Sequence, residues 1–342
     1  MSRPYSVIQI GFGSIGKLIA KKVIERENLR LVGLIDVNPE LIGKNVEDIL
    51  SLPGDSKTKI YENLQSFLEE VKERVDVSII ATSSSLTAVR PSIIDSIRAG
   101  LDVISICEEL SFPYMRHPEI SKELDEEARD LKKTILGTGI NPGYLMDLLP
   151  IVLTTPCQIV DSITVTRHMN SSYRRFSFQK KIGTGMTQTE FRKNIDEGSI
   201  TGHVGLVESI RMIDSALNLE LDNIKEIPPE PLIAEKTVTN SFTTIKKGDV
   251  LGLKSMGVGM RNSKTIVQLN FLAYAEAEPQ YDEIVIEGFP KIHQRIEGGV
   301  QGDYSTIAMI LNLIPILSSA GPGLVTMKDI PVPRNTERVF KN

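Results

Sequence analysis

The sequence predicts an α/β fold: an N-terminal Rossmann domain with a doubly wound parallel sheet, followed by a second α+β domain with a mixed or antiparallel sheet. Three observations predict it. The 342 residues exceed what one hydrophobic core usually holds, so two domains are expected. Short runs rich in Val and Ile alternate with helical patterns up to about residue 137. A Gly-x-Gly-x-x-Gly turn, Gly11–Gly16, stands between the first strand and the first helix.

The first half of the chain has the periodicity of repeated strand–helix–strand units. Gly100 stands where the C-terminal cap of a helix is expected, directly before a strand. The alternation is typical of a doubly wound sheet. Buried parallel strands are predicted over 6–10, 31–36, 77–82, 103–106 and 134–137, and amphipathic helices over 14–26, 62–74, 86–99 and 118–132.

Past about residue 150 the runs lengthen and alternate, which predicts a sheet with one covered face. The three prolines of 226–231 predict a loop there. We expect a final helix over 305–317, followed by a Gly-Pro-Gly turn and a polar tail, to pack back on the first domain. The domains are thus 1–147 completed by 304–342, and 148–303 for substrate binding and dimerisation. The other elements expected are strands over 159–166, 233–238, 266–275 and 282–287 and helices over 189–195 and 204–217.

Composition excludes several classes of function. The net charge of -5, with both signs interspersed, attracts neither nucleic acid nor an anionic membrane. No apolar run approaches the roughly 18 residues of a membrane span, and no signal-peptide pattern precedes the first strand. Cys107 and Cys157 form no CxxC pair, which favours a reducing, cytoplasmic compartment. The four His and two Cys lack ligand spacing, so no metal is expected.

The glycine turn predicts a dinucleotide site. The first glycine permits the tight turn, the second lets the backbone approach a pyrophosphate, and the third allows close helix–strand contact. Asp36 ends the second strand 20 residues after Gly16, where a carboxylate binds a ribose hydroxyl. It would repel a 2′-phosphate, so NAD is favoured over NADP, although Lys17 or Lys44 would soften the preference. The residues of the turn expected to bind the cofactor are Gly11, Phe12, Gly13, Ser14, Ile15 and Gly16.

Two further segments are expected near the nicotinamide. Thr82, Ser83 and Ser84 follow a strand and would run under that half of the cofactor; alternatively they are a helix-capping cluster with Ser85 as the cap. In 139–143, N–H groups next to Asn141 and Pro142 would contact nicotinamide or substrate, a role compatible with a plain strand-to-helix turn.

Two carboxylates, Glu108 and Glu109, come directly after the strand at 103–106. Ligands of open α/β sheets bind outside the carboxyl ends of the strands, so the pair is expected at the cofactor cleft. Successive side chains diverge, and only one should face the substrate. A carboxylate there suits an ammonium group and can accept its proton. The alternative is a pair of solvated residues that begin a loop.

The second domain offers candidate substrate-binding residues. Arg174, Gln179 and Lys180 belong to a basic patch that would bind a substrate carboxylate, unless it is a solvated loop. His203 begins a helix and would either reach the cleft or serve the structure. Asp303, before the returning helix, is expected to cap it rather than to contact the cofactor.

Five segments together resemble one family, that of 2,4-diaminopentanoate dehydrogenase and the related native amine dehydrogenases. The resemblance extends from Gly11 to Arg334. The segments are Cys107–Pro113, Gly137–Gly143, Gln179–Gly185, Gly202–Leu206 and Gly299–Thr306.

The resemblance implies a fold like that of dihydrodipicolinate reductase, reversible oxidative deamination with NAD(P), and a catalytic glutamate in Cys-Glu-Glu-Leu. In distantly similar dehydrogenases the second position of that segment is a lysine near the nicotinamide, which favours Glu109, with Glu108 as the alternative. The His-His-x-x-x-x-x-Lys and Ser-Gly-Thr-Ala segments of the reductase are absent from the sequence. The reductase reaction therefore does not carry over.

The sequence therefore predicts an amine dehydrogenase that converts an amine into a ketone and ammonia, or the reverse, with a homodimer as the expected assembly. One alternative is a homoserine dehydrogenase-like reductase acting on an alcohol or aldehyde, which would not need ammonia. The other is a non-catalytic protein that senses NAD and binds it without turnover.

Overall fold

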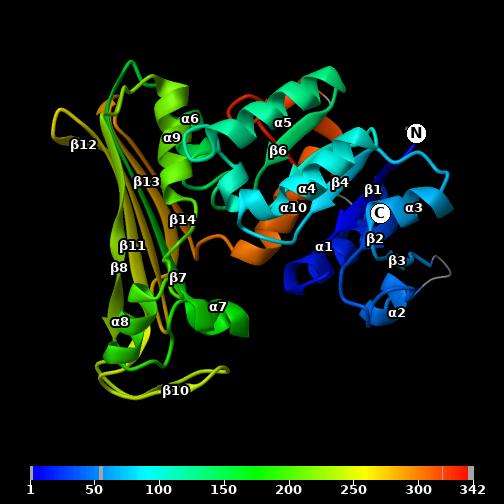
Figure 1. Ribbon diagram of the computed structural model, residues 1–342. Coiled ribbons are helices and arrows are strands. Elements are labelled where there is room, and N and C mark those ends of the chain that lie inside the picture. Colours follow the sequence, from blue (N-terminus) through cyan, green and yellow to red (C-terminus); the bar gives the residue numbers. More distant parts are fainter. Residues whose placement is uncertain (1–2, 54–56, 318, 338–342) are drawn as a thin grey trace. The chain divides into compact units, whose positions relative to one another are not determined.

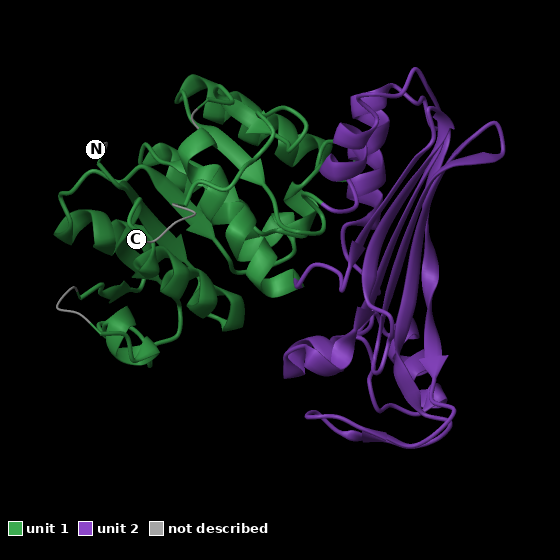
Figure 2. Ribbon diagram, turned by 180° about the vertical axis from the view of Figure 1, so that it is seen from behind, with its two compact units in different colours: residues 1–144, 302–342 green, residues 145–301 purple. Residues whose placement is uncertain are grey.

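The structure is a computed structural model that describes residues 3–53, 57–317 and 319–337. The chain divides into two compact units, residues 1–144 with 302–342 and residues 145–301 (Figure 2). Among the described residues, no helix has both the length and the apolar character that crossing a membrane requires.

The first unit is built on a seven-stranded sheet in which every pairing is parallel. The strand order reverses direction at β1, which is the switch point of a doubly wound sheet. The Rossmann fold expected from the sequence is confirmed. The order is β15-β6-β5-β4-β1-β2-β3, with β1 (Tyr5–Ile10), β2 (Leu29–Ile35), β3 (Ile60–Tyr61), β4 (Val77–Ile80), β5 (Asp102–Ser105), β6 (Thr134–Gly137) and β15 (Gly323–Val325).

Helices cover this sheet, α1 packing with α10 and α4 with α5. As predicted, Gly100 ends α4: its φ is +83°, its N–H donates to Ile97 O at 2.9 Å, and Leu101 N–H donates to Ser96 O at 3.1 Å. The helices are α1 (Ser14–Glu25), α2 (Val46–Leu50), α3 (Leu64–Glu70), α4 (Leu86–Arg98), α5 (Pro118–Asp130) and α10 (Gly302–Leu317), with a 3₁₀ turn, η1 (Glu108–Leu110).

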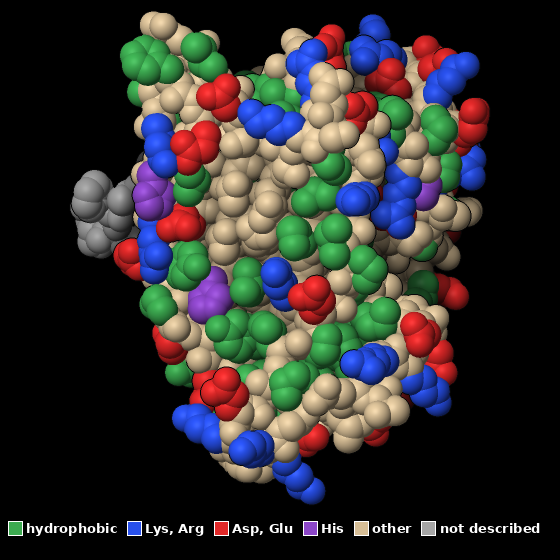
Figure 3. Space-filling view, turned by 90° about the vertical axis from the view of Figure 1, so that its left-hand side faces the viewer, with side chains coloured by type: hydrophobic (Ala, Val, Ile, Leu, Met, Phe, Trp, Pro, Cys, Tyr) green, Lys and Arg blue, Asp and Glu red, His purple; other side chains and the backbone are tan. Residues whose placement is uncertain are grey.

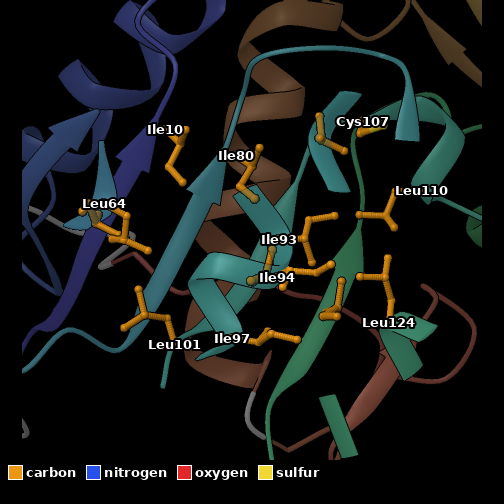
Figure 4. Packing of buried hydrophobic residues seen from close by; sticks show 14 of the residues in the cluster. Ile10, Leu64, Ile80, Ile93, Ile94, Ile97, Leu101, Cys107, Leu110 and Leu124 are labelled. Atoms are coloured by element: carbon orange, nitrogen blue, oxygen red, sulfur yellow. The ribbon is translucent and has the colours of Figure 1, made fainter. Parts of the chain in front are cut away.

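The core of this unit forms where α3, α4 and α5 meet the sheet (Figure 4). Ile93 and Ile97 lie one turn apart on α4 and are buried against Ile80 of β4 and Leu124 of α5. Burying a side chain of this size stabilises the fold by about 1.5–3 kcal/mol. The same packing brings the carboxyl ends of β4 and β5 together at one edge.

The C-terminal segment completes the first unit. Tyr5 Oη donates to Pro315 O at 3.3 Å, and α10 also contacts β5. The residues after α10 were expected to form only a turn and a polar tail, which is wrong in part, because Gly323–Val325 forms β15 beside β6. A three-residue strand is too short for periodicity to reveal.

The second unit is built on a six-stranded sheet in which β12 and β7 pair in parallel and the other neighbours are antiparallel, so the predicted mixed sheet is confirmed. The order is β14-β13-β7-β12-β11-β8, with β7 (Ile159–Asn170), β8 (Asn223–Ile233), β11 (Val250–Arg261), β12 (Lys264–Tyr274), β13 (Tyr281–Phe289) and β14 (Ile292–Glu297). The remaining elements are α6 (Leu148–Leu153), η2 (Ser171–Tyr173), α7 (Phe176–Lys181), α8 (Gln188–Asp196), α9 (Leu206–Leu217) and a hairpin of β9 (Val238–Thr239) and β10 (Thr244–Ile245).

Two expectations for this unit are wrong. The segment 226–231 is not a loop but lies within β8. Proline lacks the N–H that a central strand must donate, yet β8 is the last strand of the sheet and pairs only with β11. Two register shifts in that pairing accommodate the prolines. The predicted strand over 233–238 likewise divides, since β8 ends at Ile233 and β9 begins at Val238.

The two faces of this sheet differ. Helices lie over one face (Figure 1), and α9 packs so closely that a Cβ on Gly257 would lie 3.0 Å from Ile210. Alternate residues of β12, such as Leu269 and Phe271, are buried under this cover, while Leu272 on the opposite face is only half-buried. We call these the covered face and the open face.

Candidate active site

The glycine turn after β1 has the geometry that a dinucleotide needs. Gly11 has φ +101°, and a Cβ there would lie 2.6 Å from Ala81 O. A Cβ on Gly16 would lie 2.2 Å from Gly11 O, so α1 can approach the turn only with glycine at this position. Nothing lies within 4 Å of a Cβ on Gly13. The first and third glycines therefore serve close packing, and the second opens onto the space that a pyrophosphate takes.

The amino end of α1 faces the same space. The first bond within the helix runs from Lys17 N–H to Gly13 O at 2.9 Å, so the N–H groups of Ser14, Ile15 and Gly16 precede the helical ladder. Sequence reasoning missed Gln9, a fully buried residue of β1 whose Nε2 donates to Gly11 O and Gly16 O, both at 2.8 Å. A polar residue inside an apolar strand was the available signal.

Asp36 follows β2 directly and lies beside the turn. Its Oδ2 accepts a hydrogen bond from Phe12 N–H at 2.7 Å, and its Oδ1 accepts one from Asn38 N–H at 2.9 Å. Two backbone donors thus fix the carboxylate where the ribose next to the pyrophosphate would lie. The open second glycine, the helix N–H groups and this acid together fit a nicotinamide dinucleotide.

The loop after β4 connects this turn to the glutamates. Thr82 Cγ2 lies 2.9 Å from the Cβ position of Gly11, and Ser84 O accepts hydrogen bonds from Glu109 N–H at 3.3 Å and from the Cys107 thiol at 3.1 Å. Ser83 Oγ accepts from Ser85 N–H at 3.1 Å. Ser85 is the N-cap residue of α4, as the alternative interpretation expected, but its side chain makes no capping hydrogen bond.

The glutamates lie on η1, which packs on β6. A Cβ on Gly137 would lie 2.5 Å from Leu110 O, so the turn reaches the strand only across a glycine. Cys107, just before η1, is buried, and this burial, with the charges of Glu108 and Glu109, raises the pKa of its thiol to about 12. The thiol is therefore a neutral packing group between the two strand ends.

The two carboxylates have different surroundings. Glu109 Oε2 accepts from Leu86 N–H, the first residue of α4, at 2.8 Å, and lies 3.0 Å from His117 Nε2. Its Oε1 lies 3.1 Å from an Arg116 guanidinium nitrogen, and the side chain is 13% exposed. Glu108 is half-buried, and its carboxylate has no hydrogen bond or ion pair with any residue that the structure describes. Sequence reasoning did not find Arg116 or His117.

The segment 139–143 lies at the carboxyl end of β6. A Cβ on Gly143, which has φ +127°, would lie 2.5 Å from Gly139 N, and Thr306 Oγ1 of α10 accepts from Ile140 N–H at 3.2 Å. Asn141 and Pro142 lie between these anchors. The expectation that Asp303 caps α10 is wrong, because the helix begins at Gly302 and Asp303 lies in its first turn.

In the second unit a cavity of about 160 Å³ opens beside η2, and Arg174 is one of its lining residues. The Arg174 guanidinium stands 4.4 Å from the centre of the Phe178 ring. One wall is a buried pair, Arg167 and Asp282, 3.4 Å apart, which holds the backbone of Val300 from both sides. Burial raises the pKa of Asp282, and Arg167 offsets part of that rise.

The other predicted substrate residues lie in different surroundings. Gln179 is buried, its Nε2 donating to Arg174 O at 2.9 Å and its Oε1 accepting from Asn240 at 2.8 Å. Lys180 is exposed and is not among the residues that line the cavity. His203 stacks on Phe271 at 4.2 Å, and the cross-strand partner of Phe271 is Arg167. Arg174 and Gln179 are thus in direct contact, and His203 lies over the covered face.

A dinucleotide turn on a Rossmann sheet is typical of nicotinamide-dependent dehydrogenases. Here two carboxylates follow β5, two strands away from β1 at the same edge of the sheet. Comparison with known proteins supports this class. Residues 144–342 match the family model described as the 2,4-diaminopentanoate dehydrogenase C-terminal domain, and residues 2–109 match that of a CoA binding domain. The chain is 32% identical over 333 residues to the 2,4-diaminopentanoate dehydrogenase of Acetoanaerobium sticklandii, covering 96% of this chain and 94% of that protein. It belongs to the 2,4-diaminopentanoate dehydrogenase family.

Two further relatives agree over the full length. The amine dehydrogenase of Streptomyces virginiae is 22% identical over 357 residues, with 96% of each chain covered. The solved structure of the amine dehydrogenase from Mycobacterium smegmatis superposes with a TM-score of 0.82 at 21% identity, covering 98% of this chain and 97% of that one. The family resemblance and the fold class expected from the sequence are confirmed, and the chain is an oxidoreductase that uses a nicotinamide cofactor.

Proposed function

We propose that this chain catalyses the reversible oxidative deamination of a small amine, with NAD as its preferred cofactor. In the opposite direction it would convert a ketone and ammonia into the amine. The observation that carries the proposal is the acidic end of β5, where Glu108 and Glu109 lie at the same sheet edge as the glycine turn. The 32% identity to a 2,4-diaminopentanoate dehydrogenase supports an amine as the group acted on.

The chemistry assigns one carboxylate to the substrate nitrogen. Glu109, or Glu108 as the alternative, accepts a proton from the substrate ammonium and frees the lone pair that forms the C=N bond. A nicotinamide held by the glycine turn and Asp36 would supply the acceptor for the hydride that leaves the carbon bearing the nitrogen. The carboxylate then faces the positive charge of the iminium, which it stabilises. Water adds to the iminium carbon, and loss of ammonia leaves the ketone.

We propose that the cavity beside η2 binds a substrate carboxylate through Arg174. A guanidinium can hold a carboxylate with two parallel hydrogen bonds. Gln179 supports the backbone of Arg174, the exposed Lys180 adds positive charge nearby, and His203 lies over the same face of the sheet as Arg167. The substrate class would then be amines that also carry a carboxylate, of which 2,4-diaminopentanoate and 4-aminopentanoate are examples.

We propose a cytoplasmic homodimer that forms through the open face of the second unit. Figure 3 shows hydrophobic side chains across the middle of this face, and Met256, Leu272 and Val285 are among its half-buried residues. Four strands of the sheet hold 11 or 12 residues and the other two hold 9 and 6, so the face measures roughly 1,000 Å² at about 3.3 Å per residue and 4.8 Å between strands. A stable interface needs about 800 Å² per partner, so a second copy fits. Both cysteines are unpaired thiols, as a reducing compartment favours.

The function is tested by following the reduction of NAD⁺ with a panel of amines: 2,4-diaminopentanoate, 4-aminopentanoate, simple 2-aminoalkanes and α-amino acids. We expect turnover of at least one amine, and ketone reduction that stops when ammonia is omitted. Ammonia-independent reduction would instead support the alcohol or aldehyde reductase. Activity with none of the amines would refute the proposal. Replacing Glu109 and then Glu108 by Gln should identify the catalytic one by its loss of kcat in a folded protein.

A further inference from the structure

We infer that His117 and Arg116 are positioning residues, which hold the Glu109 carboxylate in the orientation that the substrate nitrogen requires. This inference rests on the proposed function. It concerns a group of side chains that come together from three elements of the first unit: η1, the amino end of α4 and the segment that leads into α5.

The contacts leave Glu109 little freedom. Leu86 N–H and His117 Nε2 approach Oε2 at 2.8 and 3.0 Å, and Arg116 approaches Oε1 at 3.1 Å. An ionised carboxylate has about four acceptor positions, so one position remains for a further donor such as a substrate ammonium. Three donors stabilise the negative charge and fix the plane of the group before any substrate binds.

His117 is itself held firmly. It is the residue before α5, its N–H donates to Pro113 O at 2.8 Å, and its carbonyl accepts from Ser121 N–H at 2.9 Å and from Ser121 Oγ at 2.7 Å. Its side chain is 19% exposed, whereas that of Arg116 is 50% exposed. Solvent screens the Arg116 pair more, so His117 should contribute more to the orientation.

Glu109 also joins α4 to α5. If His117 and Arg116 served only this connection between the helices, the variants would show a different pattern of activity. A matched pair makes the same connection without touching Glu109: Arg90 of α4 binds Glu123 of α5 through two contacts of 2.8 and 2.5 Å. If His117 and Arg116 only joined the helices, loss of Arg90 should have the same effect on activity. If they position Glu109, it should have none.

The experiment compares His117→Leu, His117→Gln, Arg116→Gln and Arg90→Gln with the wild-type enzyme. For each we would measure kcat and KM for the best amine of the panel, the Kd of NADH by fluorescence, and the melting temperature. We expect His117→Leu to lower kcat by about 10- to 100-fold, the effect of a displaced catalytic group. NADH binding should stay unchanged. His117→Gln keeps an N–H donor and should recover most of the lost kcat. Arg116→Gln should lower kcat less than His117→Leu does, and Arg90→Gln should leave kcat unchanged.

Three results would overturn the inference: His117→Leu keeping the kcat of the wild type, Gln failing to recover it, or Arg90→Gln losing as much. A wild type inactive with every amine would refute the proposed function itself, and the inference with it. If His117→Leu does not fold, the other two variants decide. The inference then requires that kcat falls in Arg116→Gln and is largely kept in His117→Gln, with both melting temperatures at the wild-type value.

Discussion

Replacing Asp36 by Ser should change the choice of cofactor. The carboxylate is held by the N–H groups of Phe12 and Asn38, so it cannot swing away from a 2′-phosphate. A phosphate of about -1.5 charge at about 5 Å is repelled by roughly 1 kcal/mol at the dielectric constant of water and roughly 5 kcal/mol at an effective value of 20. Asp36 is half-exposed, so the lower part of this range applies.

Serine also removes the charged acceptor for the ribose hydroxyl of NAD, a loss of about 1.5–3 kcal/mol. Together the two effects should shift the ratio of kcat/KM for NAD⁺ over NADP⁺ by about 100-fold or more toward NADP⁺. The assay is initial-rate kinetics with both cofactors and one amine, in wild type and variant. A wild type that prefers NADP⁺, or an unchanged ratio in the variant, would refute the reasoning.

Three further predictions follow from the geometry of single positions. Gly16→Ala places a Cβ 2.2 Å from a backbone oxygen and should lower the free energy of unfolding by about 1–3 kcal/mol, as measured by urea denaturation, whereas Gly13→Ala should keep the stability and weaken only NADH binding in a fluorescence titration. Because its pKa of about 12 keeps Cys107 protonated at pH 8, the native protein should react with a disulfide reagent at Cys157 alone, and rapid reaction of both thiols would contradict the burial. Arg174→Gln should raise KM for 4-aminopentanoate at least 10-fold but leave KM for 2-aminoalkanes unchanged, and equal effects on both would exclude a carboxylate site.

Much of the first unit could be predicted because its elements have strong periodicity. The strands at 5–10 and 134–137 and the four long helices lie within a few residues of their predicted bounds, apart from the shorter α3. β3 and β15, with two and three residues, are too short to produce a pattern. In the second unit β11 was missed because Gly252, Gly257 and Gly259 interrupt its apolar run. The last two of these glycines are explained by α9, whose side chains take the space of their Cβ atoms.

In the candidate site, too, the positions set by local sequence patterns could be predicted, and the contacts set by the packing of distant segments could not. The glycine turn, Asp36 and the two glutamates are adjacent to predicted strand ends, so their positions follow from the local fold. The contacts of Glu109 with Leu86 and His117 depend on how α4 and α5 pack against each other, which no local pattern encodes. The same holds for Arg174, whose cavity wall includes residues more than 100 positions later in the chain.

The return of α10 and β15 to the first unit has a consequence for the order of synthesis. The ribosome delivers β1 to β6 first, then the whole of residues 145–301, and only afterwards the helix that buries Ile307, Ile310 and Leu313. Until then the nascent Rossmann sheet lacks its last strand and leaves apolar surface and an unpaired β6 edge exposed. The nucleotide-binding half, although first in the sequence, is therefore the last part of the protein to close, and the second unit has to fold as an insertion within it.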